Sequence, residues 1–202
     1  MQSRAETIWE ALKPFIEERR KQDYTLTQTA FESHAPRLIE SLKAAMLSCD
    51  EQAAAYRQKG EKDETAFIAA SFLDSSVIIG AYDLRIDFYD REFLSDIAES
   101  CAYFSYVHLI PFYEESVDAI CAKATEEFVR FMDYEKDALA YKYRNDILYQ
   151  MALTTYKKCL EQPEIAEFLT SLSVVSDFAF TFGRFMRDQE VCMRISDITV
   201  AP

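Results

Sequence analysis

Residues that break helices and form tight turns are scarce along this chain. Its 202 residues include three glycines and five prolines, and Asn145 is the one asparagine. A chain of average composition would hold about fourteen glycines, at roughly 7% usage. Folds built only from strands need a turn every 8 to 12 residues or so, and those turns use Gly, Pro, Asn and Asp. The scarcity therefore predicts few and long elements, which means an all-α fold.

The chain also has the material for a sizeable core. Half of its residues are hydrophobic and 14% are aromatic, which excludes a disordered chain. Apolar residues recur at steps of three and four, as in Val117, Cys121, Ala124 and Phe128. We predict a single helical bundle domain of about seven helices over residues 1–190. Residues 191–202 should form a short irregular or extended tail.

The expected helices can be placed from the same spacing and from the few helix-breaking residues. They cover 3–22, 27–59, 63–89, 91–109, a segment after Pro111, 136–160 and 164–187. Pro14 and Pro36 should kink or interrupt the first two helices, because an interior proline costs about 3 kcal/mol. Gly60 should end the second helix, and Pro163 should open the last one.

Charge and cysteine content limit the kinds of partner. The net charge is −13, from 35 acidic and 22 basic residues, and such a field repels phosphate backbones. Cysteine occurs five times without a CxxC pair, which is typical of reduced, buried thiols in the cytosol. No segment approaches the roughly 20 apolar residues that span a bilayer, and no secretory signal pattern is present. We expect a cytoplasmic protein with a protein or small-molecule partner, and neither nucleic acid nor membrane.

One short segment of the chain carries three aspartates. If it is helical, Asp83, Asp87 and Asp90 fall within about 60° of one another, since each residue advances the helix by about 100°. A divalent cation would offset their repulsion, and carboxylates suit Mg²⁺. The alternatives are that the three face water, or that Arg85 and Arg91 screen them.

A second acidic pair follows later in the sequence. Asp87-x-x-Asp90 and Glu115-x-x-Asp118 have the same spacing. This arrangement is similar to the acidic pairs on facing helices with which all-helical nucleotide pyrophosphohydrolases hold Mg²⁺, although here the first pair is aspartate and the adjacent glutamates ahead of it are absent. The resemblance implies that Asp87, Asp90, Glu115 and Asp118 hold the metal, and together with Asp83 from the aspartate segment they are the candidate metal ligands. Otherwise these acids stabilise a helix N-terminus or face water, and no cofactor is expected.

Catalytic motifs are missing from the sequence. It contains no HExxH, no GxSxG and no glycine-rich phosphate loop. His34 and His108 stand in no ExxH pair, which argues against a di-iron bundle. His108 lies among aromatic residues and fits a core or boundary position better than a catalytic one. We therefore predict no catalytic residue and favour a protein that is not an enzyme.

Five tyrosines, one aspartate and one histidine are the ligand or interface candidates. Tyrosine combines apolar area with a hydroxyl and is favoured at pocket walls and interfaces, although it also lies at core boundaries. Asp74 is the one charge in the window 66–82, so it caps a helix break, pairs with a distant base or binds a ligand. The candidates are Asp74, Tyr82, Tyr89, Tyr103, Tyr106, His108 and Tyr113.

Apolar residues surround the expected helix over 172–186, whereas a surface helix of a monomer keeps a polar face. Either this helix is central or one side meets a second chain, and a homodimer through 172–186 is slightly favoured.

Three functions are consistent with these features. The preferred one is a non-catalytic interaction or ligand-binding module, such as an adaptor, a chaperone-like protein or a regulatory partner. The alternative is a Mg²⁺-dependent hydrolase of a phosphorylated small molecule or nucleotide that uses the helical carboxylates. The third is the ligand-sensing half of a regulator whose DNA-binding part lies on another chain.

Overall fold

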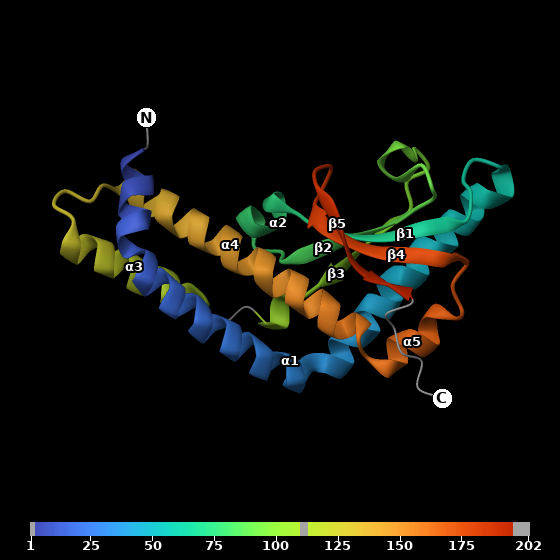
Figure 1. Cartoon of the computed structure of the whole chain (residues 1–202), viewed down its shortest axis with the longest axis horizontal. Coiled ribbons are helices and arrows are strands. Elements are labelled where there is room, and N and C mark those ends of the chain that lie inside the picture. The colour runs from blue at the N-terminus through green and yellow to red at the C-terminus, as the bar shows by residue number, and fades with distance from the viewer. Residues whose placement is uncertain (1–2, 110–112, 196–202) are drawn as a thin grey trace. The chain divides into compact units, whose positions relative to one another are not determined.

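The computed structural model describes residues 3–109 and 113–195 (Figure 1). Within them the chain forms five α-helices and a five-stranded mixed sheet, so the fold is α+β and the predicted all-α helical bundle is wrong. The helices are α1 (Arg4–Lys59), α2 (Asp74–Ile79), α3 (Tyr113–Glu127), α4 (Asp133–Leu160) and α5 (Pro163–Leu169). The strands are β1 (Thr65–Phe72), β2 (Asp83–Tyr89), β3 (Cys101–Ser105), β4 (Val174–Arg184) and β5 (Gln189–Arg194).

The chain forms two compact units, and each is assembled from two separate stretches of sequence. Unit 1 consists of Met1–Ser33 and His108–Met151, and unit 2 of His34–Val107 and Ala152–Pro202. Helices α1 and α4 each contribute one part to either unit. The expected domain boundary at residue 190 falls inside β5, and residues 196–202 of the expected tail lie outside the described residues.

Unit 1 packs the first parts of α1 and α4 together with α3. Their meeting point is Asp23, whose buried carboxylate accepts hydrogen bonds from Ser116 Oγ (2.8 Å) and from Tyr143 Oη (2.7 Å). Burial raises the pKa of Asp23, and the two hydroxyls oppose that shift. The start of α1 is fixed separately, because Arg4 donates to the carbonyl of Val129 (2.8 Å) and pairs with buried Glu135 (3.2 Å).

Unit 2 is built on a sheet with the strand order β3-β2-β1-β4-β5. β1 runs parallel to β4, and all other neighbouring strands are antiparallel. The second parts of α1 and α4 cover one face (Figure 1). On that face the Cys49 thiol donates to the Ile86 carbonyl (3.3 Å), and the Tyr156 ring lies 6.4 Å from that of Phe180. The buried apolar strand residues there include Ile68, Ala70, Phe72, Leu84, Ile86, Phe88, Phe104, Phe180 and Phe182.

Three of the predicted helices are wrong because parts of each form strands, and one of these strands shows an alternation of apolar and polar residues. In the segment 83–88, polar residues at 83, 85 and 87 alternate with apolar residues at 84, 86 and 88, which is the period of a strand. The predicted helix 63–89 therefore contains β1, α2 and β2, and 91–109 contains β3. The predicted helix 164–187 ends at Leu169 and continues as β4. β4 lies between β1 and β5, which explains its apolar character without a second chain and removes the helical basis of the expected dimer.

Several turns in this chain form without glycine, and this is the reason that its composition was misleading. Tyr82, Phe93 and Met186 adopt positive φ angles of 54°, 54° and 55°, in a region that usually holds glycine. Asp90 and Asp96 each accept the backbone N–H two residues further on, at 2.8 and 2.9 Å. Such side-chain turns replace Gly and Asn, so a low content of both does not exclude strands.

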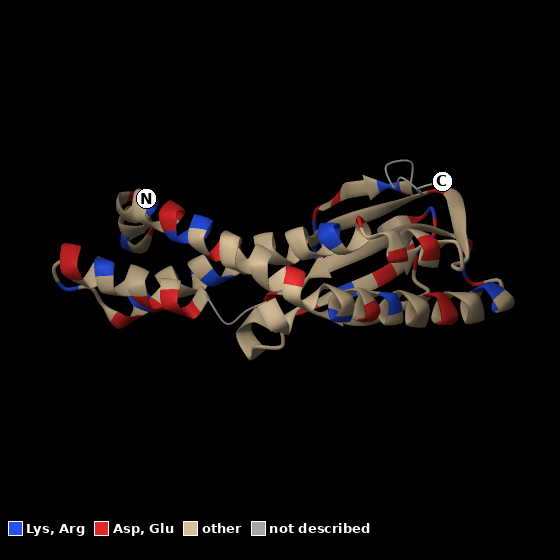
Figure 2. Cartoon of the chain, turned by 90° about the horizontal axis from the view of Figure 1, so that it is seen from below, with Lys and Arg blue, Asp and Glu red and all other residues tan. Residues whose placement is uncertain are grey.

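Several predicted helix boundaries are confirmed. α1 ends at Lys59 before Gly60, whose φ is 72°, and Pro163 opens α5. Pro14 and Pro36 do not interrupt α1, where buried apolar residues on both sides of each proline hold the helix against its unit. Both acidic and basic residues occur along the second part of α1 (Figure 2). Among the described residues, no helix has both the length and the apolar character needed to cross a bilayer.

Candidate functional site

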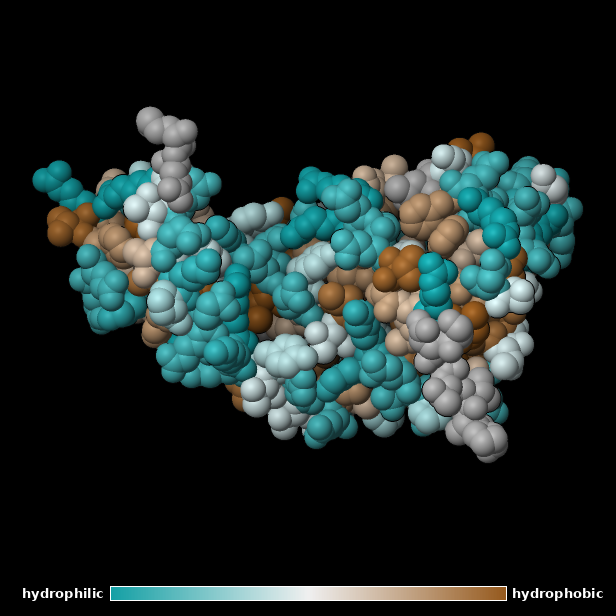
Figure 3. Space-filling model, in the orientation of Figure 1, coloured by the Kyte–Doolittle hydropathy of each residue, from teal (hydrophilic) through white to brown (hydrophobic). Residues whose placement is uncertain are grey.

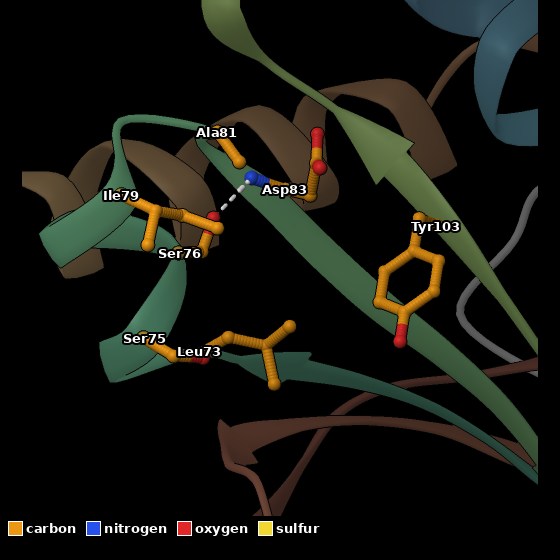
Figure 4. Close-up of a pocket in the computed structure, with 7 residues that line it drawn as sticks. All are labelled: Leu73, Ser75, Ser76, Ile79, Ala81, Asp83 and Tyr103. Atoms are coloured by element: carbon orange, nitrogen blue, oxygen red, sulfur yellow. Dashed lines mark hydrogen bonds between the residues drawn. The ribbon is translucent and has the colours of Figure 1, made fainter.

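A pocket of about 280 Å³ lies in unit 2 where β1, α2, β2 and β3 approach one another (Figure 4). It is lined by Leu73, Ser75, Ser76, Ile79, Ala81, Asp83 and Tyr103. Leu73 directly follows β1, Asp83 begins β2, and Tyr103 is the middle residue of β3. The walls are therefore aliphatic and aromatic, with two serines and one carboxylate.

Local hydrogen bonds hold α2 beside the start of β2. Gly80 ends the helix with a φ of 69°, and its N–H donates to the carbonyl of Val77 (3.4 Å). The N–H of Ala81 donates to the carbonyl of Ser76 (3.0 Å), which completes a Schellman motif. Ser76 Oγ in turn accepts the N–H of Asp83 at 2.7 Å (Figure 4). These hydrogen bonds fix the C-terminal end of α2 and join the helix to the first residue of β2, so the pocket wall that α2 forms is held in place.

Apolar side chains around this pocket are left in water. Ile78 and Ile79 of α2 are 72% and 76% exposed, and Tyr103 is 57% exposed. Apolar surface costs about 25 cal/mol per Å² when it stays in water, so bare neighbouring aliphatics often mark an interaction site. Elsewhere, on the face that Figure 3 shows, apolar residues form small islands among hydrophilic ones.

Asp83 differs from the other aspartates around it. Its carboxylate accepts no hydrogen bond and forms no ion pair within residues 3–109 and 113–195. Nearby, Asp74 is paired with Arg184, Asp87 with Arg85, and Asp96 with Lys62. The pocket therefore presents one negative charge that the described part of the chain does not neutralise.

The same end of the sheet has a free strand edge, because β3 is the outermost strand. The N–H of Tyr106 donates to Tyr82 (3.1 Å), and the N–H of Phe88 donates to Ser100 (3.0 Å), so the even-numbered residues of β3 bond to β2. The odd-numbered residues point their N–H and C=O groups away from the sheet. These are Cys101, Tyr103 and Ser105.

Only the first of these three residues has its backbone groups bonded in the described part of the chain. Gln52 of α1 donates from Nε2 to the carbonyl of Cys101 (2.9 Å) and accepts its N–H at Oε1 (3.1 Å), as a neighbouring strand would. The outward groups of Tyr103 and Ser105 have no such partner within the described residues. We call the half of the β2–β3 hairpin around Cys101 its closed end, and the half around Ser105 and Asp83 its open end.

The closed end is filled by an ion-pair network. Asp87 is 2% exposed and accepts two hydrogen bonds from Arg85, at 2.9 Å from Nε and 2.8 Å from Nη2. Arg85 also pairs with Glu99, and its guanidinium lies 4.5 Å from the ring centre of Phe185. Burial raises the pKa of Asp87, and the bonds from Arg85 oppose that rise.

The five predicted metal ligands are not brought together around one ion. Asp83 begins β2 and Asp87 lies four residues further along it, so the two are about 13 Å apart at roughly 3.3 Å per residue. Asp90 accepts the backbone N–H groups of Asp63 and Glu92 instead. Glu115 and Asp118 belong to α3 in unit 1. Within the described ranges, no group of three or more His, Cys, Asp or Glu residues is arranged to hold a metal.

The remaining predicted residues are dispersed. Tyr103 lines the pocket, and Asp74 pairs with Arg184, as in one of the three alternatives considered for it. Tyr89 packs edge-on against Phe93 with ring centres 5.3 Å apart, and burial raises its pKa to about 12. The others are Tyr82, half-buried before β2; Tyr106, buried with a hydroxyl that has no partner in the described structure; His108, half-buried in the 3₁₀ turn Val107–Leu109; and Tyr113, buried in unit 1.

Sequence reasoning missed Leu73, Ile79, Gln52 and Ser105. Alternation along residues 83–88 was a signal for β2, and it would have separated Asp83 from Asp90. Nothing local in the sequence pairs Gln52 with Cys101, because they are 49 positions apart.

Comparison with known proteins does not assign a function to this site. No protein-family model, no curated protein and no solved structure matches this chain.

Proposed function

We propose that this chain is a non-catalytic binding module that takes up an extended segment of another protein along the open edge of β3. The segment adds to the sheet as a sixth strand and bonds to the backbone of Tyr103 and Ser105. Strand addition of this kind draws affinity from main-chain hydrogen bonds and specificity from pockets for alternate side chains.

The proposal rests on two outward-facing residues whose backbone groups have no partner among the described residues and which lie at the same end of the hairpin as exposed apolar side chains. Unpaired strand edges promote aggregation, and proteins usually cover or charge them. Here Gln52 bonds to the first outward residue, while the outward groups of Tyr103 and Ser105 have no partner in the described part of the chain, and Tyr103 lines the pocket together with exposed Ile79. Backbone groups, exposed apolar area and a pocket thus lie together at the open end.

A second copy of this chain fits the edge less well than a foreign segment. Antiparallel pairing of two copies about Tyr103 would set Ser105 of each copy against Cys101 of the other. The backbone groups of Cys101 are already bonded to Gln52. Two chains of net charge −13 also repel each other.

The proposal needs no metal and no catalytic group, and no particular contact favours the hydrolase alternative. We also propose that the module works in the cytosol. Its five cysteines are free thiols, which is the usual state in that compartment.

The test compares two substitutions at one position. A display library of random heptapeptides is selected on the purified chain, and the enriched peptides are measured by fluorescence anisotropy on wild type, Ser105→Pro and Ser105→Ala. Proline removes the outward N–H and is tolerated on strand edges, whereas alanine keeps that N–H. We expect binding to weaken about tenfold with proline and to change less than about twofold with alanine. Enrichment of no peptide, or equal binding to the proline variant, would overturn the proposal.

A further inference from the structure

We infer that the segment bound along β3 carries a lysine or arginine opposite Ser105, and that the Asp83 carboxylate recognises its cationic group. This inference rests on the proposed strand addition and names the partner's chemistry. It follows from the register of the sheet, from the lining of the pocket and from the charge of Asp83.

The register sets the distance that the side chain must cover. Asp83 and Ser105 are direct cross-strand partners, so their side chains share one face of the sheet. The residue of an added strand that faces Ser105 points to the same face. Neighbouring strands lie about 4.8 Å apart, so that residue and Asp83 are separated by about 10 Å across Ser105. The serine side chain is too short to block the path, and only a long side chain reaches the carboxylate.

The lining of the pocket suits such a side chain along its whole length. Leu73, Ile79 and Tyr103 offer aliphatic and aromatic surface, and Asp83 supplies the one charge. Lysine and arginine bury their methylene stems on apolar surface and keep the charged head near a polar partner. A purely aliphatic side chain would use the walls and leave Asp83 without a partner, and an acidic one would be repelled.

The charges around the site indicate that the partner supplies the basic side chain that pairs with Asp83. Asp74, Asp87 and Asp96 each have a basic partner within unit 2. Asp83 has none in the described residues, although it stands on the same strand and face as Asp87. A net charge of −13 also speeds the encounter with a basic segment at low salt.

The experiment uses defined peptides and a charge exchange. The probe is the acetylated and amidated heptapeptide TVTKTVT, with matched peptides in which the lysine is norleucine or glutamate. Each is titrated against wild type, Asp83→Asn and Asp83→Lys, and Ser105→Pro reports whether binding uses the β3 edge. Norleucine keeps the apolar stem and removes the charge, so it isolates the contribution of Asp83.

We expect the lysine peptide to bind wild type about tenfold more tightly than the norleucine peptide, a gain typical of a charged hydrogen bond. Asp83→Asn should abolish that preference without weakening the norleucine peptide, and Asp83→Lys should favour the glutamate peptide. Equal binding of all three peptides to wild type, still sensitive to Ser105→Pro, would overturn this inference and leave the proposed function standing. Failure of every peptide to bind would overturn both.

A small cation is the competing source of the same chemistry. Nα-acetyl-lysine methylamide presents the side chain without a strand. We expect it to bind at least about a hundredfold more weakly than the heptapeptide, because it lacks the main-chain hydrogen bonds. Equal affinity of the two would overturn the assignment of a protein segment and identify a site for free amines.

Discussion

The two ends of the β2–β3 hairpin carry the same kinds of group, an aspartate and outward-facing backbone groups of β3, but these groups are bonded at one end only within the described residues. At the closed end, Asp87 is bonded to Arg85, and the outward backbone of Cys101 is bonded to Gln52. At the open end, Asp83 and Ser105 have no such partners in the described residues. Within the described residues, the same hairpin therefore contains one carboxylate and one stretch of strand edge that are bonded, and one of each that are not. The difference identifies the open end as the surface on which a partner supplies the missing groups.

Loss of the cation at the closed end should have the largest effect. Arg85→Met leaves Asp87 buried without its ion pair, and breaking a buried pair in this way costs about 3–5 kcal/mol. Urea denaturation measures the change in the free energy of unfolding. The double variant Arg85→Met/Asp87→Leu serves as the control and should recover most of the loss. A single-variant loss below about 1 kcal/mol would contradict the role given to this pair.

The same variant should acquire a pH dependence at the closed end. Burial already holds the pKa of Asp87 above its ordinary value, and removal of Arg85 removes the group that opposes this rise. The folded state then binds the proton more tightly than the unfolded state, where the pKa is about 3.9. Stability therefore falls as pH rises from about 4 towards the raised pKa, and the penalty of Arg85→Met is smallest at acidic pH. Urea midpoints measured between pH 4 and 8 should show this slope, and Arg85→Met/Asp87→Leu should lack it.

Removal of the edge cover should have an intermediate effect. Gln52→Ala frees the N–H and C=O of Cys101 to water and is expected to cost about 1 kcal/mol. Hydrogen exchange of the Cys101 amide should then approach the rates of Tyr103 and Ser105. The longer free edge should also bind the peptides more tightly. An unchanged exchange rate at Cys101 would mean that Gln52 does not act as a substitute strand.

Change at the open end should affect stability least. Asp83→Asn is expected to alter the free energy of unfolding by less than about 0.5 kcal/mol, because the carboxylate has no partner to lose within the described ranges. A thermal melt with Asp87→Asn as the matched variant on the same strand measures the contrast. Destabilisation by Asp83→Asn as large as that by Asp87→Asn would show that Asp83 supports the fold.

Helices such as α3 and α4 could be predicted from the sequence, whereas the strands of the sheet could not. Steps of three and four correctly predicted α3 and α4, and Gly60 and Pro163 correctly predicted an end and a start. The strands were missed because glycine was taken as the measure of turns, whereas Tyr82, Phe93 and Met186 adopt its conformation. A positive φ at a bulky residue is imposed by tertiary packing, and local composition does not reveal it.

The candidate site was predicted in part. Asp83 and Tyr103 were both named from the sequence, but as a metal ligand and as a general aromatic candidate. Read as part of a strand, residues 83–88 would have placed Asp83 and Arg85 on one face. The proximity of Leu73 and Ile79 to Tyr103, and of Gln52 to Cys101, depends on strand pairing between distant segments. Such pairing has no signature in a single sequence.

The assembly of each unit from two separate stretches decides how the chain can be divided. A single cut at any position removes part of a unit, because unit 1 is interrupted by residues 34–107 and unit 2 by residues 108–151. Isolation of the sheet unit therefore requires deletion of residues 1–33 and a new covalent join between Val107 and Ala152. An N-terminal truncation that stops at or before residue 33 removes residues of unit 1 alone, a C-terminal truncation that stops at or after residue 152 removes residues of unit 2 alone, and every longer truncation removes parts of both units.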